Sequence, residues 1–288
     1  MCGIVGAISE RKISRILLEG LKRLEYRGYD SAGIALLSER SDKLQQLRSV
    51  GKVRKLSDTI TKRKLQGTIG IAHTRWATHG KPSVKNAHPH SSQNEIAIVH
   101  NGIIENHELL RFRLTERGYE FKTETDSEVI AHLIHQEKKN GKVSFLNSVI
   151  RALGKLKGAY GICAIDNSNR DQIIVARSGS PIVIGIGIGE NFIASDTLAL
   201  GHVTDRFIYL EEGDIAQVTR ESVEIWNNAE QVSRPITTID SKIKDAQKGE
   251  YKHFMLKEIY EQPIVLKDTL DGRITARKVL EEAFGVKA

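Results

Sequence analysis

The chain has 288 residues, of which 40% are hydrophobic and 27% charged, as in globular proteins that bury a sizeable core. No apolar run reaches the roughly 18 residues of a membrane-spanning helix, and the opening segment, charged from Glu10 onward, lacks the pattern of a secretory signal. The lack of such a run leads us to expect no membrane partner. Because the only cysteines are Cys2 and Cys163, we expect a cytoplasmic protein with no disulfide framework.

The net charge of +7 raises the question of a nucleic-acid partner. Much of the early positive charge falls in two short basic segments, 52–55 and 62–64. Aromatic residues, which would stack on bases, make up only 6% of the chain and are absent from both segments. We therefore expect a solvated basic face and no nucleic acid. The alternative, a nucleic-acid-binding protein, predicts binding that falls steeply with salt.

The first part of the chain alternates strands and helices. Ile13, Leu17 and Leu21 recur at helical spacing, which predicts an amphipathic helix over 13–26. Between two of the expected strands lies 75–93, a loop rich in Gly, Pro, Ser and His, and long loops in compact domains are usually functional. Apolar runs predict strands at 2–9, 32–38, 68–74 and 95–101.

Helices are expected next, and then many short strands. Thr125 followed by Glu128 predicts a capping box at the start of the second helix. Helices are predicted over 105–117, 126–139 and 144–156. Short apolar runs predict strands at 159–166, 172–178, 181–187, 191–195, 206–210, 214–219 and 223–226. Such strands, joined by turns, predict antiparallel sheets combined with helices, an α/β (α+β) fold class.

The C-terminal part differs in composition. Residues 228–250 are polar and are interpreted as a linker, and 251–271 as a helix interrupted at Pro263. We expect two domains, 2–227 and 228–288.

Cys2 is the first candidate for chemistry. Removal of Met1 would give one residue both a thiol and a free α-amino group. The amine has an ordinary pKa near 8, so it can act as base for its own side chain, as in N-terminal nucleophile enzymes. The alternative is that Cys2 is a small buried apolar residue, as free cysteines often are. Cys163, in an apolar strand, is expected to be inert.

A series of motifs decides between these two readings of Cys2. Five motifs appear in order and at sensible spacing: MCGIVG at the start, LEYRGYDSAG (24–33), HTRWATHG (73–80), HNGIIENH (100–107) and TETDSEVIAHL (123–133). Five further motifs belong to the series: NAHPH (86–90), ARSGSP (176–181), ASD (194–196), EEGDIA (211–216) and KEIYEQP (257–263). The chain thereby resembles the class II glutamine amidotransferases, and within them the enzymes that aminate fructose 6-phosphate. The resemblance covers nearly the whole chain to about residue 274 and implies the four-layer αββα sandwich of N-terminal nucleophile hydrolases, with mainly antiparallel sheets.

The resemblance also implies roles for individual residues. Cys2 would attack the side-chain amide of L-glutamine to form a thioester and release ammonia. Asn101 and Gly102 would form the oxyanion hole, through the Asn amide and the Gly N–H. Taken alone, an Asn-Gly pair after a strand usually marks a tight turn, which is the alternative for these two residues.

The substrate's charged groups need partners of their own. Arg75 would bind the α-carboxylate and Asp126 the α-ammonium, although an acidic residue is also favoured at a helix N-terminus. Trp76, Thr78 and His79 would belong to a loop that closes over glutamine. The many histidines fit no zinc spacing, and the family needs no metal or other cofactor for this chemistry, so neither is expected.

The family enzyme is roughly twice as long as this chain and carries sugar isomerase domains that accept the ammonia. We expect a glutaminase that hydrolyses L-glutamine to glutamate and ammonia, with a sugar isomerase half or partner outside this sequence. The ammonia would serve glucosamine 6-phosphate synthesis. An apolar helix face near the C-terminus suggests a homodimer. The remaining alternative is a non-catalytic regulatory or dimerising remnant of the enzyme.

Overall fold

The protein is described from a computed structural model that covers residues 2–28, 30–38, 41–76, 80–141, 143–239, 251 and 254–270. By its internal contacts the chain divides into two compact units, Met1–Ile243 and Lys244–Ala288. Among the residues described, no helix is long and apolar enough to cross a membrane.

The first unit contains two antiparallel sheets. The eight-stranded sheet has the order β15-β11-β9-β10-β1-β4-β2-β3, and the seven-stranded sheet has the order β14-β13-β12-β8-β7-β6-β5. The first sheet comprises β1 (Gly3–Ser9), β2 (Ser31–Ser38), β3 (Ser41–Val50), β4 (Ile69–Arg75), β9 (Val183–Ile186), β10 (Glu190–Ala194), β11 (Arg206–Tyr209) and β15 (Ile236–Thr238). The second comprises β5 (His90–Ser92), β6 (Ile96–Ile104), β7 (Gly158–Asp166), β8 (Asn169–Ser178), β12 (Ile215–Val218), β13 (Val223–Asn227) and β14 (Glu230–Val232).

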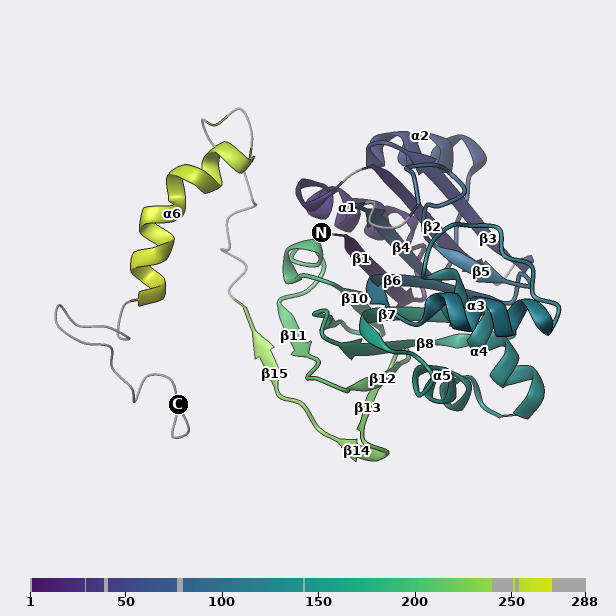
Figure 1. The fold of residues 1–288 in the computed structure, drawn as a ribbon. Coiled ribbons are helices and arrows are strands. Elements are labelled where there is room, and N and C mark those ends of the chain that lie inside the picture. The colour runs from purple at the N-terminus through teal and green to yellow at the C-terminus, as the bar shows by residue number, and fades with distance from the viewer. Residues whose placement is uncertain are drawn as a thin grey trace. The chain divides into compact units, whose positions relative to one another are not determined.

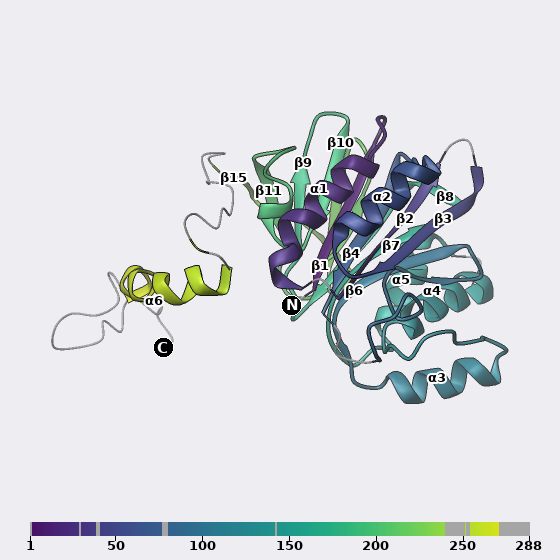
Figure 2. The same cartoon turned by 90° about the horizontal axis from the view of Figure 1, so that it is seen from above.

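Helices cover the outer face of each sheet (Figures 1 and 2). The first sheet is covered by α1 (Ser14–Leu24) and α2 (Val53–Arg63), and the second by α3 (His107–Glu116), α4 (Glu128–Gly141) and α5 (Phe145–Leu153). Short 3-10 turns occur at Glu25–Arg27 and Thr197–Ala199. The layers therefore follow the order helix, sheet, sheet, helix, and the predicted αββα sandwich is confirmed.

Three apolar clusters hold these layers together. One joins α1 and α2 to the first sheet, one fills the space between the sheets, and one joins the second sheet to α3, α4 and α5. Burying a large aliphatic side chain stabilises a fold by roughly 1.5–3 kcal/mol. Strand alternation divides the residues between clusters: Ile4 and Ile8 of β1 face the second sheet, whereas Val5 and Ala7 face the helices. This alternation also positions the functional side chains.

The elements β3 and α2 are among those that were not predicted from the sequence. The edge strand β3 is largely polar, and α2 is dominated by its basic residues. Val53, Leu56 and Ile60 give α2 a buried stripe at helical spacing, while the basic side chains of 52–55 and 62–64 are exposed. Their exposure is what a solvated basic face requires.

The polar linker predicted over 228–250 is wrong in its first part. There β14 pairs with β13, and β15 pairs with β11. Between them Arg234 donates two hydrogen bonds to the fully buried carboxylate of Asp214, at 2.9 and 2.8 Å. Residues 240–250 lie outside the described part of the chain. As a division of function, the domains 2–227 and 228–288 stay a prediction.

In the second unit the described element is α6 (Phe254–Leu270). The helix continues through Pro263, so the interruption predicted there is wrong. Proline lacks the backbone donor that would bond the carbonyl four residues earlier; here that residue is Ile259, which is 53% exposed. Apolar side chains are exposed along this helix, among them Met255, Tyr260, Ile264 and Leu266.

Candidate functional site

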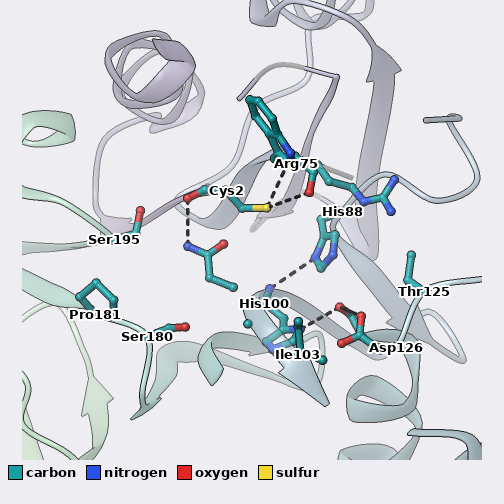
Figure 3. A pocket seen from close by; sticks show the side chains of 14 residues that line it. Cys2, Arg75, His88, His100, Ile103, Thr125, Asp126, Ser180, Pro181 and Ser195 are labelled. Carbon is teal, nitrogen blue, oxygen red and sulfur yellow. Dashed lines mark hydrogen bonds between the residues drawn. The ribbon is translucent and has the colours of Figure 1, made fainter. Parts of the chain in front are cut away.

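The candidate site lies where residues just before β1, at the end of β4 and in β6 line one cavity. Figure 3 shows the side chains around it. Along β4, Ile69 and Ile71 face the space between the sheets, so Arg75 shares their face. Along β6, Ala97 and Val99 face the same space, and so does Asn101. Cys2 lies just before β1, two residues before Ile4, and so shares the face on which Ile4 and Ile8 point into the space between the sheets. The apolar pattern of three strands therefore directs a thiol, a cation and an amide toward one another.

These side chains surround one cavity of about 380 Å³. Of the predicted site residues, Cys2, Arg75, Trp76, Asn101, Gly102 and Asp126 line it. Thr78 and His79 lie outside the described residues, and their place in a closing loop stays a prediction. The cavity is also lined by His88, His100, Ile103, Thr125, Ser127, Ser180, Pro181 and Ser195, which the sequence did not single out as site residues.

Cys2 is partly buried at the edge of the cavity. The backbone N–H of Trp76 donates to Cys2 Sγ at 3.2 Å, and the thiol faces the Trp76 carbonyl at 3.5 Å. Burial raises the pKa of the Cys2 thiol, and the Trp76 N–H and the Arg75 cation offset only part of that increase. The thiol is thus mainly protonated at neutral pH, and a nucleophilic attack requires a base.

Asn101 and Gly102 lie inside β6, paired with Gly161 and Tyr160 of β7. This position excludes the tight Asn-Gly turn. Asn101 Nδ2 donates to the Cys2 carbonyl oxygen at 3.2 Å, so the amide nitrogen points to the cysteine. Gly102 has φ 134°, and a Cβ there would lie 2.0 Å from the carbonyl oxygen of Ala159. Only glycine fits this position.

Arg75 and Asp126 bring opposite charges to the cavity. Arg75 is buried and donates to the Gly80 carbonyl at 3.1 Å. Asp126 is buried just before α4 and accepts from the backbone N–H of Ile104 at 2.8 Å. A cavity lined by a guanidinium and a carboxylate suits a ligand that carries both a carboxylate and an ammonium group.

The capping box predicted from Thr125 and Glu128 is wrong. The Glu128 carboxylate accepts from the backbone N–H groups of Lys122 and Thr123 and from the Thr123 hydroxyl. These hydrogen bonds and the nearby His132, whose Nε2 lies 3.7 Å from the Glu128 carboxylate, outweigh burial and lower the pKa of Glu128 to about 2. The anion fixes the turn that precedes Asp126, so Glu128 helps to place a site residue.

Four buried histidines line or back the cavity. His73 and His88 stack with ring centroids 4.2 Å apart, and His88 contacts His90 edge to face at 4.3 Å. Burial lowers the pKa of His73 and of His90 to about 3, and it also lowers the pKa of His88 and His100. All four rings are therefore neutral at pH 7. Within the described part of the chain, no cluster of three or more His, Cys, Asp or Glu residues is arranged to hold a metal ion.

Trp76 is 57% exposed, and its position in the long loop agrees with a surface role rather than a core role. Ser195 was missed as a site residue: its hydroxyl accepts from the Ile4 N–H at 3.1 Å, which fixes the start of β1. No local pattern reveals this contact, because the two residues are far apart in sequence and meet only through pairing of β1 with β10.

Comparison with known proteins agrees with this architecture. A family model described as "Glutamine amidotransferase domain" matches residues 73–200. Over its whole length the chain is 56% identical to the glutamine–fructose-6-phosphate aminotransferase (isomerizing) of Idiomarina loihiensis and 55% identical to that of Pseudomonas aeruginosa, and it spans 47% of the length of each. A solved glutamine phosphoribosylpyrophosphate amidotransferase from B. subtilis, 28% identical, superposes with a TM-score of 0.67 over 78% of this chain and 49% of that one.

These similarities assign residues 73–200 to the glutamine amidotransferase domain family, and the family resemblance seen in the motifs is confirmed. Within that family, the chain is homologous over its whole length to the N-terminal glutaminase part of the glutamine–fructose-6-phosphate aminotransferases.

Proposed function

We propose that this chain hydrolyses the side-chain amide of L-glutamine to glutamate and ammonia. The observation that carries the proposal is the set of groups around a single cavity: the thiol of Cys2, the amide of Asn101, the guanidinium of Arg75 and the carboxylate of Asp126. Arg75 would bind the α-carboxylate of glutamine and Asp126 its α-ammonium, which leaves the side-chain amide facing Cys2. This double requirement excludes simple amides.

The reaction follows from these positions. With Met1 removed, the α-amine of Cys2 takes the thiol proton, and Sγ attacks the amide carbon of glutamine. Asn101 Nδ2 and the Gly102 N–H stabilise the negative oxygen that develops, and removing one such donor typically costs roughly 10²–10³ in rate. The C–N bond breaks, the proton leaves with ammonia, and a γ-glutamyl thioester remains. Water then cleaves the thioester, releasing glutamate and restoring the thiol.

Trp76, Thr78 and His79 are proposed to close over the bound glutamine and keep water from the thioester until ammonia has left. The names of the relatives support a further step outside this sequence, in which the ammonia aminates fructose 6-phosphate for glucosamine 6-phosphate synthesis. We propose a sugar isomerase half or partner as the acceptor. No metal or organic cofactor is needed for the proposed glutaminase reaction.

Two further expectations stay predictions. The free thiols of Cys2 and Cys163 support a cytoplasmic location. The exposed apolar residues of α6 support a contact with another subunit or domain, and a homodimer is one form of it.

Glutamate release by the purified chain tests the proposal. We expect turnover of L-glutamine that a glutamine-like alkylating analogue abolishes by adding one equivalent at Cys2, and loss of all turnover in Cys2→Ala with the fold retained. Intact mass establishes whether Met1 has been removed, because a retained Met1 blocks the α-amine. A folded protein without Met1 that neither turns over glutamine nor reacts with the analogue would be a non-catalytic remnant.

A further inference from the structure

We infer that His73 is a positioning residue that holds the Asn101 amide with its nitrogen toward Cys2. The inference rests on the proposed function, because it assigns His73 a part in forming the oxyanion hole. His73 lies on β4, on the same inter-sheet face as Ile69 and Ile71. It is 1% exposed and does not line the cavity, so it acts only through a neighbour.

The hydrogen bonds determine the proton position on His73. Its Nε2 lies 3.0 Å from Asn101 Oδ1 and 3.1 Å from the carbonyl oxygen of His100. A backbone carbonyl can only accept a hydrogen bond, so His73 Nε2 carries the hydrogen and donates. The ring is held in this orientation by stacking on His88.

The same network determines which way the Asn101 amide faces. An Asn amide has two ends of nearly equal shape, and only hydrogen-bond partners distinguish them. At one end Nδ2 meets the Cys2 carbonyl, an acceptor, and at the other Oδ1 meets His73 Nε2, a donor. A flipped amide would place oxygen against oxygen at Cys2 and nitrogen against the N–H of His73. Without the donor on His73, only one of these two penalties opposes the flip.

The ring must also be neutral. Burial lowers the pKa of His73 to about 3, so at pH 7 it donates from Nε2 without adding a second cation beside Arg75. Its Nδ1 is buried and has no hydrogen-bond partner among the described residues. A residue selected only for core packing does not need a donor at Nε2, whereas a positioning residue does.

The test compares His73→Gln with His73→Met in the full chain. The two side chains are similar in length and size, but only Gln places an N–H donor near the position of Nε2. We expect His73→Met to lower kcat by up to about 100-fold with little change in KM, since a misplaced oxyanion donor affects the transition state more than binding. His73→Gln should stay within about fivefold of the wild type if its amide takes over the donor role.

A double-variant cycle separates positioning from packing. In an Asn101→Ala background, His73→Met and His73→Gln should have the same kcat, because there is no amide left to orient. If Met and Gln are equivalent in the otherwise wild-type chain, or differ equally in both backgrounds, the inference is wrong. If His73→Met does not fold, His73→Asn replaces it, because its donor lies near the Nδ1 position. A wild-type chain without turnover would instead overturn the proposed function, and this inference with it.

Discussion

The space between the two sheets is filled differently at its two ends. One end is packed with aliphatic side chains from both sheets, including Ile71 of β4 and Val99 of β6. At the other end the same two strands present His73 and Asn101, each two residues further along its strand. The apolar end therefore sets the pairing and spacing of the strands, and these in turn determine the geometry of the polar end.

The two ends also differ in what they contribute. Apolar side chains at one end stabilise the fold when buried. At the other end, buried imidazoles, an amide and a guanidinium lose their contacts with water and need hydrogen-bond partners in the protein. We therefore expect substitutions at the apolar end to change mainly stability, and substitutions at the polar end to change mainly turnover.

The largest expected effect is at the apolar end. Ile71→Ala removes a fully buried side chain and should lower the free energy of unfolding by about 2–5 kcal/mol, because both burial and packing are lost. Chemical denaturation measures the change. In the absence of denaturant, kcat per folded molecule should stay within about twofold of the wild type if the apolar end affects stability and not turnover. A large fall in kcat of the folded variant would show that the two ends are not separable.

Gly102→Ala is the corresponding change at the polar end. The new Cβ would approach the Ala159 carbonyl oxygen to 2.0 Å and displace β6 at the proposed oxyanion hole. We expect kcat to fall by roughly 10²–10³, equivalent to about 2.7–4 kcal/mol of transition-state stabilisation. Steady-state glutamate release measures it.

Gly118→Ala provides the matched control for Gly102→Ala. Gly118 also has positive φ, 84°, but a Cβ there meets nothing within 4 Å. This variant introduces backbone strain without a steric clash. Gly118 is also far from Cys2 in the sequence and has no proposed role in the reaction. It should leave kcat unchanged, and a comparable loss of turnover in both variants would remove the steric explanation.

The smallest expected effect concerns pH. The pKa of His90 is about 3 in the folded protein because of burial, below its ordinary value of 6.5. Between these two values the unfolded chain binds a proton at His90 that the folded chain does not, so stability falls as pH decreases from about 6.5 toward 3. One such group contributes a slope of at most about 1.4 kcal/mol per pH unit.

His90→Gln should therefore flatten the dependence of unfolding free energy on pH, measured by denaturant titrations between pH 7 and pH 5. Ile71→Ala should lower the whole curve and leave its slope unchanged, since no titrating group is lost. Equal slopes for the wild type and His90→Gln would contradict a neutral buried imidazole at this position.

Most of the fold could be predicted because its central strands contain apolar runs, such as GIVGAI in β1 and IGIA in β4. The edge strand β3 was not predicted, because one side of an edge strand has no neighbour and its sequence need not be apolar. In α2, basic residues obscured the buried stripe of Val53, Leu56 and Ile60. The segment after Asn227 is polar because its strands are short and exposed.

The site was predictable in a different way. Resemblance identified Cys2, Arg75, Asn101, Gly102 and Asp126, and the structure arranges them around one cavity, while their roles stay predictions. The contact between His73 and Asn101 could not be predicted, because it joins strands of different sheets. Local patterns give the face on which each residue lies, but not which strand of one sheet lies over which strand of the other.

The ion pair between Arg234 and Asp214 has a practical consequence for anyone who produces the glutaminase part alone. A polypeptide ending at Asn227, where the sequence suggests a boundary, would lack Arg234 and leave the buried Asp214 carboxylate without its cation. It would also lose β15 and leave β11 as an unprotected sheet edge, open to pairing with other chains. A polypeptide extended through Ile239 keeps both, and is the better choice for expression.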